Sequence, residues 1–209
     1  MRILRLLPVI CAALAATLAA GARTAAEAFA AAPDTVIEML SGAARLDMID
    51  YFNFGSDKAT QNALGGNARI TAMTDRLLCW QLSDSTDMQL AVLTERNDTL
   101  YALVETIMTP AADSEIRFYD RDWKPARPAM ELPARRDWLT ELGRQHADSL
   151  QRLMPFDMAA ATFDPATLTL TLRHSAPQYL PATDSAKVAP WLRPEIVFIN
   201  RGTKLVRQP

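Results

Sequence analysis

The sequence predicts an α+β fold in which helices pack on antiparallel β-sheet, and three observations lead to this class. Apolar residues recur at helical spacing in two stretches, near 24–54 and 136–154. After each stretch the spacing changes to alternation, and short turn sequences such as Ser83–Thr86 separate the alternating runs. No strand–helix–strand order with a parallel signature is present in the sequence, so the sheet is expected to be antiparallel.

The first 22 residues have the pattern of a secretory signal peptide. Arg2 and Arg5 precede an alanine-rich run from Leu6 to Ala22, which ends in the small-x-small pattern Ala20-Gly21-Ala22. Proline and glycine interrupt this run, so cleavage is favoured over a membrane span. We therefore expect residues 1–22 to be removed and the mature protein, 23–209, to be exported. It would be periplasmic or surface-associated, with no stable membrane span.

The charge balance of the mature part limits its partners. Two of the 22 Lys and Arg residues lie in the leader and none of the 24 Asp and Glu residues does, which leaves a slightly acidic protein. Nucleic acid and anionic membranes call for clustered basic residues and are disfavoured. Only Cys79 remains after cleavage, so no internal disulfide can form. We expect Cys79 to be a buried strand thiol rather than a nucleophile.

The mature chain is expected to begin with helices. Thr24 and Glu27 have the spacing of a capping box. Asp34 is placed to cap a second short helix, and apolar residues over 46–54 predict a third. The glycine-rich and polar segment 55–67 is expected to be a loop.

Alternating residues predict strands in the rest of the chain. Before the second helical stretch the expected strands are 77–82, 88–94, 100–108 and 115–119. After it we expect a hairpin of 159–163 and 168–172, a short helix near 184–192, and a last hairpin of 195–199 and 204–207.

Two segments, 115–124 and 195–204, resemble each other, since both read E-I-x-F-x-(D/N)-R-x-x-K. Strand-then-turn segments share composition, and we favour that explanation. The alternative is a duplication of a helix-plus-antiparallel-sheet unit, with halves 23–127 and 134–209. Phe118 and Phe198 would then occupy equivalent places.

Several segments are more distinctive than the spacing of apolar residues alone. They are Arg45–Tyr51, Asn62–Gly66, Thr106–Pro110, Asp113-Ser114, Arg117–Asp120 and Trp123–Pro125. With them the chain resembles domain-of-unknown-function family 3256, a group of exported proteins from Bacteroidales, over nearly the whole mature part. The resemblance implies export and supports cleavage after Ala22. It implies no activity and no catalytic residues. Five Asp-Ser/Thr-apolar tripeptides also resemble O-glycosylation acceptors of such proteins, although turns and helix caps enrich the same pairs.

No catalytic motif is present in the sequence, so no catalytic residue, metal ligand or cofactor is predicted. The two histidines, His146 and His174, are interpreted as ordinary surface or rim residues. Asp47 and Asp50 lie three apart on a helix and share a face. They are candidates for acid–base work if their environments separate their pKa values. Equally, they can cap a helix or pair with Arg45 and Arg69.

The turn formed by Asp120, Arg121, Asp122 and Trp123 is the hypothetical binding site. In the similar segment Gly202 and Thr203 stand where this turn has Asp122 and Trp123, so the acid and the indole are not required by the architecture. An exposed Trp beside charges can stack on a sugar or peptide. In the rival interpretation Trp123 is a buried core residue, and a fully buried indole would exclude recognition.

Two functions follow as alternatives. The favoured one is a non-catalytic exported binding or assembly module, whose partner is an unknown envelope protein or glycan. The other is a periplasmic hydrolase with a carboxylate-based site. A deep cleft with convergent carboxylates and a histidine would favour the hydrolase, whereas a flat or shallow sheet surface would favour binding.

Overall fold

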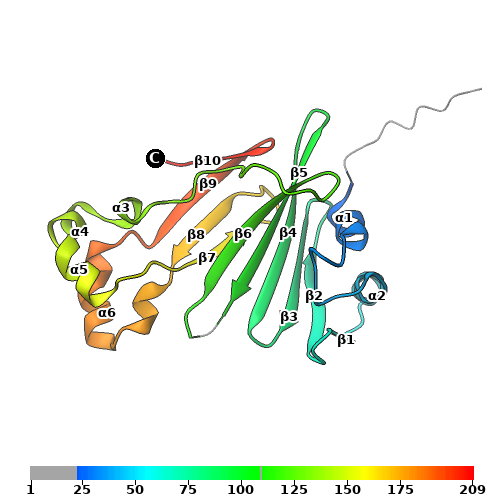
Figure 1. Cartoon of the computed structure of the whole chain (residues 1–209), viewed down its shortest axis with the longest axis horizontal. Helices are drawn as coiled ribbons and strands as arrows, with labels where there is room; N and C mark the ends of the chain where they lie inside the picture. The colour runs from blue at the N-terminus through cyan, green and yellow to red at the C-terminus, as the bar shows by residue number, and fades with distance from the viewer. Residues whose placement is uncertain (1–22, 109) are drawn as a thin grey trace, which may run out of the picture.

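The computed structural model describes residues 23–108 and 110–209, and in them the chain forms two antiparallel sheets with short helices around them (Figure 1). This confirms the α+β class. The predicted signal peptide lies outside the described residues. Among the residues that are described, no helix has the length and apolar character needed to cross a membrane.

The larger sheet is a six-stranded meander in sequence order, and the smaller sheet has the order β10-β9-β8-β7. The strands of the larger sheet are β1 (Thr60–Gln61), β2 (Asn67–Met73), β3 (Leu77–Ser83), β4 (Thr86–Glu95), β5 (Asp98–Ile107) and β6 (Asp113–Asp120). Those of the smaller sheet are β7 (Ala159–Phe163), β8 (Leu170–His174), β9 (Glu195–Arg201) and β10 (Lys204–Arg207). The helices are α1 (Ala25–Ala31), α2 (Gly42–Asn53), α3 (Arg135–Trp138), α4 (Glu141–Gln145), α5 (Ala147–Leu153) and α6 (Ala182–Val188), with 3-10 turns η1 (Ala176–Tyr179) and η2 (Ala189–Trp191).

The larger sheet is covered on both faces, which explains why its strands are so apolar. Leu78 and Leu103 belong to a core shared with α1 and α2. Leu77 and Val104, one residue away on the same strands, belong to a second core shared with the smaller sheet and with α3, α5 and α6. Because successive strand residues point to opposite faces, alternation builds both cores at once. The smaller sheet adds its own inner face to the second core.

The N-terminal helices are fixed by specific polar contacts. The capping box is confirmed: Glu27 N–H donates to Thr24 Oγ1, and Thr24 N–H donates to the Glu27 carboxylate. On α2, Arg45 is only 2% exposed, and its guanidinium donates to the carbonyls of Leu40 and Ala32. Arg45 therefore joins the start of α2 to the end of α1.

One expectation for this region is wrong. The segment after Asp34 forms hydrogen-bonded turns rather than a helix, and the Asp34 carboxylate lies 3.0 Å from the guanidinium of Arg45 instead of capping. The third helix, expected from the apolar residues over 46–54, is confirmed as α2. Its buried side chains are Arg45 and Met48, whereas Leu46 is 55% exposed.

The helical stretch expected near 136–154 is confirmed, and it consists of three short helices, α3, α4 and α5. Leu139 leaves the helical path to bridge Leu192, and Thr140 then caps α4 by accepting a hydrogen bond from Gly143 N–H. Tertiary pairing with the segment after α6 thus overrides the local helical pattern.

The two similar segments lie on β6 and β9. Phe118 and Phe198 are both buried in the core shared by the two sheets. β6 lies at the end of the larger sheet, whereas β9 is an inner strand of the smaller one. The duplication with halves 23–127 and 134–209 therefore stays a prediction. Both sheets contribute residues to the core that contains Phe118 and Phe198.

Candidate functional site

The two sheets meet where β7 lies beside β4 and β6, and side chains rather than a strand cover the outer edge of β7. Ala161 N–H donates to Ser114 Oγ at 2.8 Å, and Phe163 N–H donates to Gln89 Oε1 at 2.9 Å. The amide nitrogen of Gln89 in turn donates to the carbonyl of Ala161 at 2.9 Å. Near the start of β7, Ala159 N–H donates to the Asp113 carboxylate at 3.1 Å. Polar side chains of the larger sheet therefore form hydrogen bonds with the backbone groups along this edge of β7.

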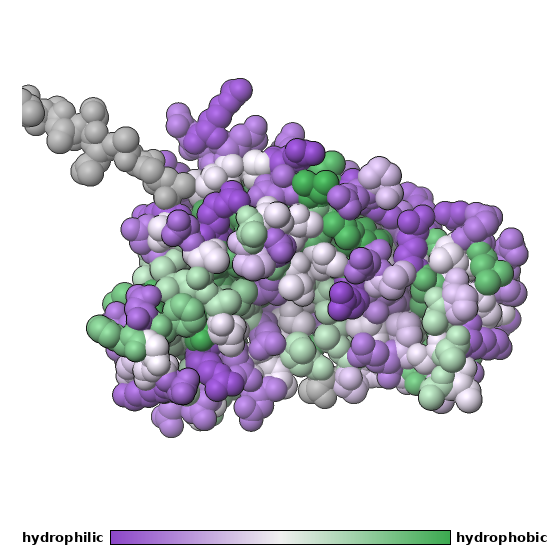
Figure 2. All heavy atoms as spheres, turned by 180° about the vertical axis from the view of Figure 1, so that it is seen from behind, coloured by the Kyte–Doolittle hydropathy of each residue, from purple (hydrophilic) through white to green (hydrophobic). Residues whose placement is uncertain are grey.

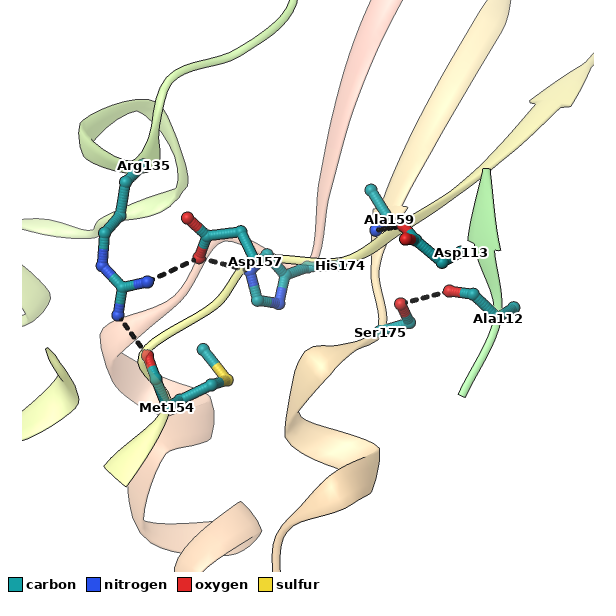
Figure 3. Close-up of polar contacts among 8 residues, drawn as sticks. All are labelled: Ala112, Asp113, Arg135, Met154, Asp157, Ala159, His174 and Ser175. Atoms are coloured by element: carbon teal, nitrogen blue, oxygen red, sulfur yellow. Dashed lines mark hydrogen bonds and ion pairs between the residues drawn. The ribbon is translucent and has the colours of Figure 1, made fainter. Parts of the chain in front are cut away.

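A cluster of ionisable groups lies next to this junction (Figure 3). His174, at the end of β8, is enclosed, with its side chain only 1% exposed and its ring 4.8 Å from that of Trp138 in an edge-on arrangement. Its Nε2 lies 3.5 Å from Asp157 Oδ1, and neither ring nitrogen makes a hydrogen bond within the described part of the chain. Arg135 donates to the same carboxylate at 3.1 Å and to the carbonyl of Met154 at 2.6 Å.

The electrostatics of this cluster suit a structural role. Burial raises the pKa of the Asp157 carboxyl, but the contact with His174 and the charge of Arg135 act in the opposite direction and leave that pKa below its ordinary value. Asp157 is thus an ionised anchor rather than a proton donor at neutral pH. Ser175, the next residue after His174, donates its hydroxyl to the Ala112 carbonyl and is not paired with a base.

The prediction that His174 is a surface or rim residue is therefore wrong, because its neighbours Trp138 and Asp157 come from distant segments and close over it. His146 does lie at a rim, half-buried and stacked on Trp191 with ring centroids 4.5 Å apart. Asp47 and Asp50 are exposed on α2. The structure does not bring them together with either histidine in a surface hollow. Within the described residues, no group of three or more His, Cys, Asp or Glu side chains could hold a metal ion.

The predicted binding turn, Asp120–Trp123, has a structural role, because Trp123 is buried and only 5% exposed. Its ring packs against Tyr101 and Tyr119 with centroid separations of 4.6 and 5.6 Å. The carboxylate of Asp120 accepts the N–H groups of Asp122 and Lys124, both at 2.9 Å, and so shapes the turn. The exposed-indole interpretation is therefore wrong and the rival one, a buried core residue, is right.

The other two members of that predicted site, Arg121 and Asp122, are exposed and lie on the same turn. Cys79 is half-buried on β3, and burial raises its pKa to about 11, with a smaller contribution from Asp87. Its thiol stays protonated at neutral pH. The predicted strand position is confirmed, but the side chain is half-buried rather than buried.

Two hollows open along the outer side of β6, and sequence analysis did not point to them. The first has a volume of about 150 Å³ and lies between β6 and the start of β7. Its lining is mainly apolar and includes Ile116, Leu132, Trp138, Met158 and Leu172. Its polar side is formed by Asp113, Ser114 and Asp157. The second, about 500 Å³, wraps around the strand edge and is lined by Glu105, Ile107, Asp113, Ser114, Glu115, Ile116 and Leu132. His174 lines neither hollow.

The backbone beside these hollows is an open strand edge. Phe118 accepts a hydrogen bond from Ala126 N–H, and Asp120 N–H donates to Lys124, so these two residues face away from β5. By the alternation of an antiparallel pair, the N–H and C=O groups of Ser114 and Ile116 face the same way. Within the described residues, neither residue has a backbone partner on that side.

Other exposed surfaces are less organised. A shallow hollow of about 390 Å³ lies over the uncovered face of the smaller sheet, between Thr162, Arg173 and Glu195. Figure 2 shows apolar side chains gathered at the end of the molecule where α1, α2 and β1 lie, and exposed Leu46, Phe54 and Leu64 come from this region.

Comparison with known protein families shows where the chain belongs. The model of the family described as "Protein of unknown function (DUF3256)" matches residues 17–204. The chain belongs to this family. The resemblance read from the sequence motifs is thereby confirmed. No curated protein matches the chain.

The fold of this DUF3256 protein also occurs in a solved structure. A domain of an uncharacterised protein from Porphyromonas gingivalis W83 superposes with a TM-score of 0.75 at 19% sequence identity, covering 90% of this chain and 99% of the other. At this level of identity the match shows a shared fold. Neither comparison assigns an activity.

Proposed function

We propose that this DUF3256 protein is an exported, non-catalytic binding or assembly module of the bacterial envelope, and that its partner is a protein. The signal-peptide pattern of residues 1–22 supports export. The observation that carries the binding role is the open edge of β6, where an unpaired strand backbone lies beside two hollows. An uncovered strand edge presents N–H and C=O groups that are ready to pair with another chain.

The ionisable groups give less support to a hydrolase. An acid–base pair needs one carboxyl group that remains protonated at working pH, which requires a raised pKa. Asp157 has a lowered pKa, and the histidine beside it is enclosed and lines no hollow. The hollows along β6 are open at the surface, which is the geometry expected for binding.

Among binding partners, a protein is favoured over a glycan. Sugar recognition at the Asp120–Trp123 turn required an exposed indole, and Trp123 is buried. An uncovered strand edge instead offers N–H and C=O groups in the spacing that another polypeptide backbone matches.

Site-specific photo-crosslinking in the native envelope tests this proposal. A photoreactive amino acid replaces Leu132 beside the β6 hollows, Thr162 over the smaller sheet, or Leu142 as a matched exposed leucine on α4. The proposal expects export with a mature mass that begins at Arg23, and a discrete protein adduct at Leu132 but not at Leu142. Retention in the cytoplasm with an uncleaved leader refutes export, and the absence of adducts at both Leu132 and Thr162 refutes a binding role.

A further inference from the structure

We infer that the β6 edge binds an extended, basic peptide segment of another protein, which adds to the larger sheet as a seventh strand beside Ser114–Ile116. This inference rests on the proposed function and names the class of partner. It combines three features of one place: unpaired backbone, an apolar hollow beside it, and an acidic rim.

The backbone of β6 determines how the partner lies. Ser114 and Ile116 present two N–H and two C=O groups away from β5, and the segment around Pro125 covers only the far end of the strand. An extended segment placed alongside can pair with all four groups. The open stretch is short, so backbone hydrogen bonds alone give weak binding, and side chains must supply the specificity.

The smaller hollow is placed to take one apolar side chain of that segment. Ile116, Leu132 and Trp138 form much of its wall, and Leu132 is 67% exposed in the free protein. A cavity of about 150 Å³ is large enough to hold a group the size of a benzene ring in other proteins. Covering Leu132 and the nearby Ile107, which is 53% exposed, would remove apolar surface from water.

The larger hollow determines the charge of the partner. Glu105, Asp113 and Glu115 line it, and Arg117 beside them is within 2.8 Å of Glu105 and 3.9 Å of Glu115. Three carboxylates against one guanidinium leave the rim negative, which favours a Lys or Arg side chain next to the apolar one.

The same charge disfavours a second copy of this chain that pairs through its own β6. Two acidic edges would be brought together, with Glu115 of each copy at the contact, and like charges across a strand pair are destabilising. A basic segment from another protein does not cause this repulsion.

Selection from a displayed library of random twelve-residue peptides, carried out on the purified exported protein, tests the inference. Enriched peptides should place a Lys or Arg next to an aliphatic residue in an alternating pattern. Glu115→Lys and Leu132→Ser should each weaken binding of the best peptide about fivefold or more, as expected for central contacts. Leu142→Ser, a change of an exposed leucine elsewhere, should leave binding unchanged.

Methylation of the peptide backbone separates strand addition from simple side-chain docking. N-methyl groups on alternate peptide residues remove the N–H groups that face β6 and should abolish binding, whereas methylation in the other register should be tolerated. Thermal melting of each protein variant shows whether the fold is retained, since both replaced side chains are largely exposed.

Three results overturn the inference: no enriched pattern, binding insensitive to both Glu115→Lys and Leu132→Ser, or binding insensitive to backbone methylation. A concentration-dependent dimer that Glu115→Lys strengthens would also overturn it in favour of a second copy. If crosslinks form at Thr162 while no peptide binds at β6, strand addition fails and the proposed binding module stands. If no adduct forms at either Leu132 or Thr162, the proposed function fails as well.

Discussion

Gly143→Ala is expected to destabilise the protein, although alanine normally favours a helix. Gly143 is buried on α4, and a Cβ atom added there would lie 1.9 Å from the backbone carbonyl oxygen of Trp191 and 2.9 Å from its carbon. That oxygen also accepts a hydrogen bond of 3.0 Å from Thr140 N–H. Backbone cannot rotate out of the way as a side chain tip can, so α4 and η2 must move apart.

The net effect follows from three contributions. Overpacking a well-packed site costs about 1–3 kcal/mol. Loss of the Thr140–Trp191 hydrogen bond adds about 0.5–1.5 kcal/mol. The better helix propensity of alanine offsets about 1 kcal/mol of this. The free energy of unfolding should therefore fall by about 0.5–3.5 kcal/mol. For a domain of this size, each kcal/mol lowers the melting temperature by roughly 2–4 °C.

Equilibrium unfolding in urea measures this change, with Gly42→Ala on α2 as the matched control. A Cβ atom at Gly42 would meet only the Arg45 guanidinium, at an ordinary contact distance of 3.6 Å. Gly42→Ala should be neutral or slightly stabilising. If Gly143→Ala unfolds at the same urea concentration as Gly42→Ala, the close approach of α4 to η2 is wrong.

Four further substitutions test the remaining contacts. Trp123→Ala should destabilise by about 3–5 kcal/mol, as expected for a buried aromatic; unchanged stability would mean that the indole is not in the core. Arg45→Met should cost about 2–4 kcal/mol in urea unfolding, because two enclosed carbonyls lose their charged donor, whereas Asp34→Asn at the exposed partner should cost less than about 1 kcal/mol. Asp157→Asn should cost about 1.5–3 kcal/mol at pH 7. Because the folded-state pKa of Asp157 is lowered, its stabilisation is present above the unfolded value near 3.8 and is lost as pH falls through the folded pKa. The difference between wild type and Asp157→Asn should shrink below pH 4, and a difference that grows there would contradict the assignment.

Strands β3 to β6 could be predicted from the sequence because both faces of the larger sheet are buried and its residues alternate between two apolar cores. β1 and β2 were not predicted, and the loop expected over 55–67 is wrong at Thr60–Gln61, which form β1. The expected strand 159–163 agrees with β7 at both ends. The expected 168–172 begins two residues before β8, because Leu168 adopts a left-handed backbone with φ of 54° and belongs to the preceding turn. No residue type marked that conformation, which glycine or asparagine usually adopts.

The helices were harder to predict because their environment, and not their spacing, determines which side is buried. On α2 the buried face includes Arg45, a charged residue whose burial is possible because the carbonyls of Ala32 and Leu40 accept hydrogen bonds from its guanidinium. The stretch 136–154 breaks at Leu139 because that residue pairs with Leu192, about fifty positions later in the chain.

The candidate site could not be predicted from local motifs. The smaller hollow beside β6 is walled by Ile116, Leu132, Trp138 and Met158, which come together only when the two sheets meet. One sequence signal was available: Asp113-Ser114 was among the specific family motifs, and both side chains cover the edge of β7. The Asp120–Trp123 turn was also singled out, but its distinctive residues shape and fill the core.

Residue-resolved amide hydrogen exchange, measured by NMR with and without a selected basic peptide, tests the open β6 edge most directly. In the free protein the amides of Glu115 and Arg117, which face β5, should exchange slowly, and those of Ser114 and Ile116 should exchange quickly. When the peptide is added, Ser114 and Ile116 should become protected while their neighbours change little. Protection of Ile116 already in the free protein, or its continued fast exchange when the peptide is bound, would contradict strand addition at this edge.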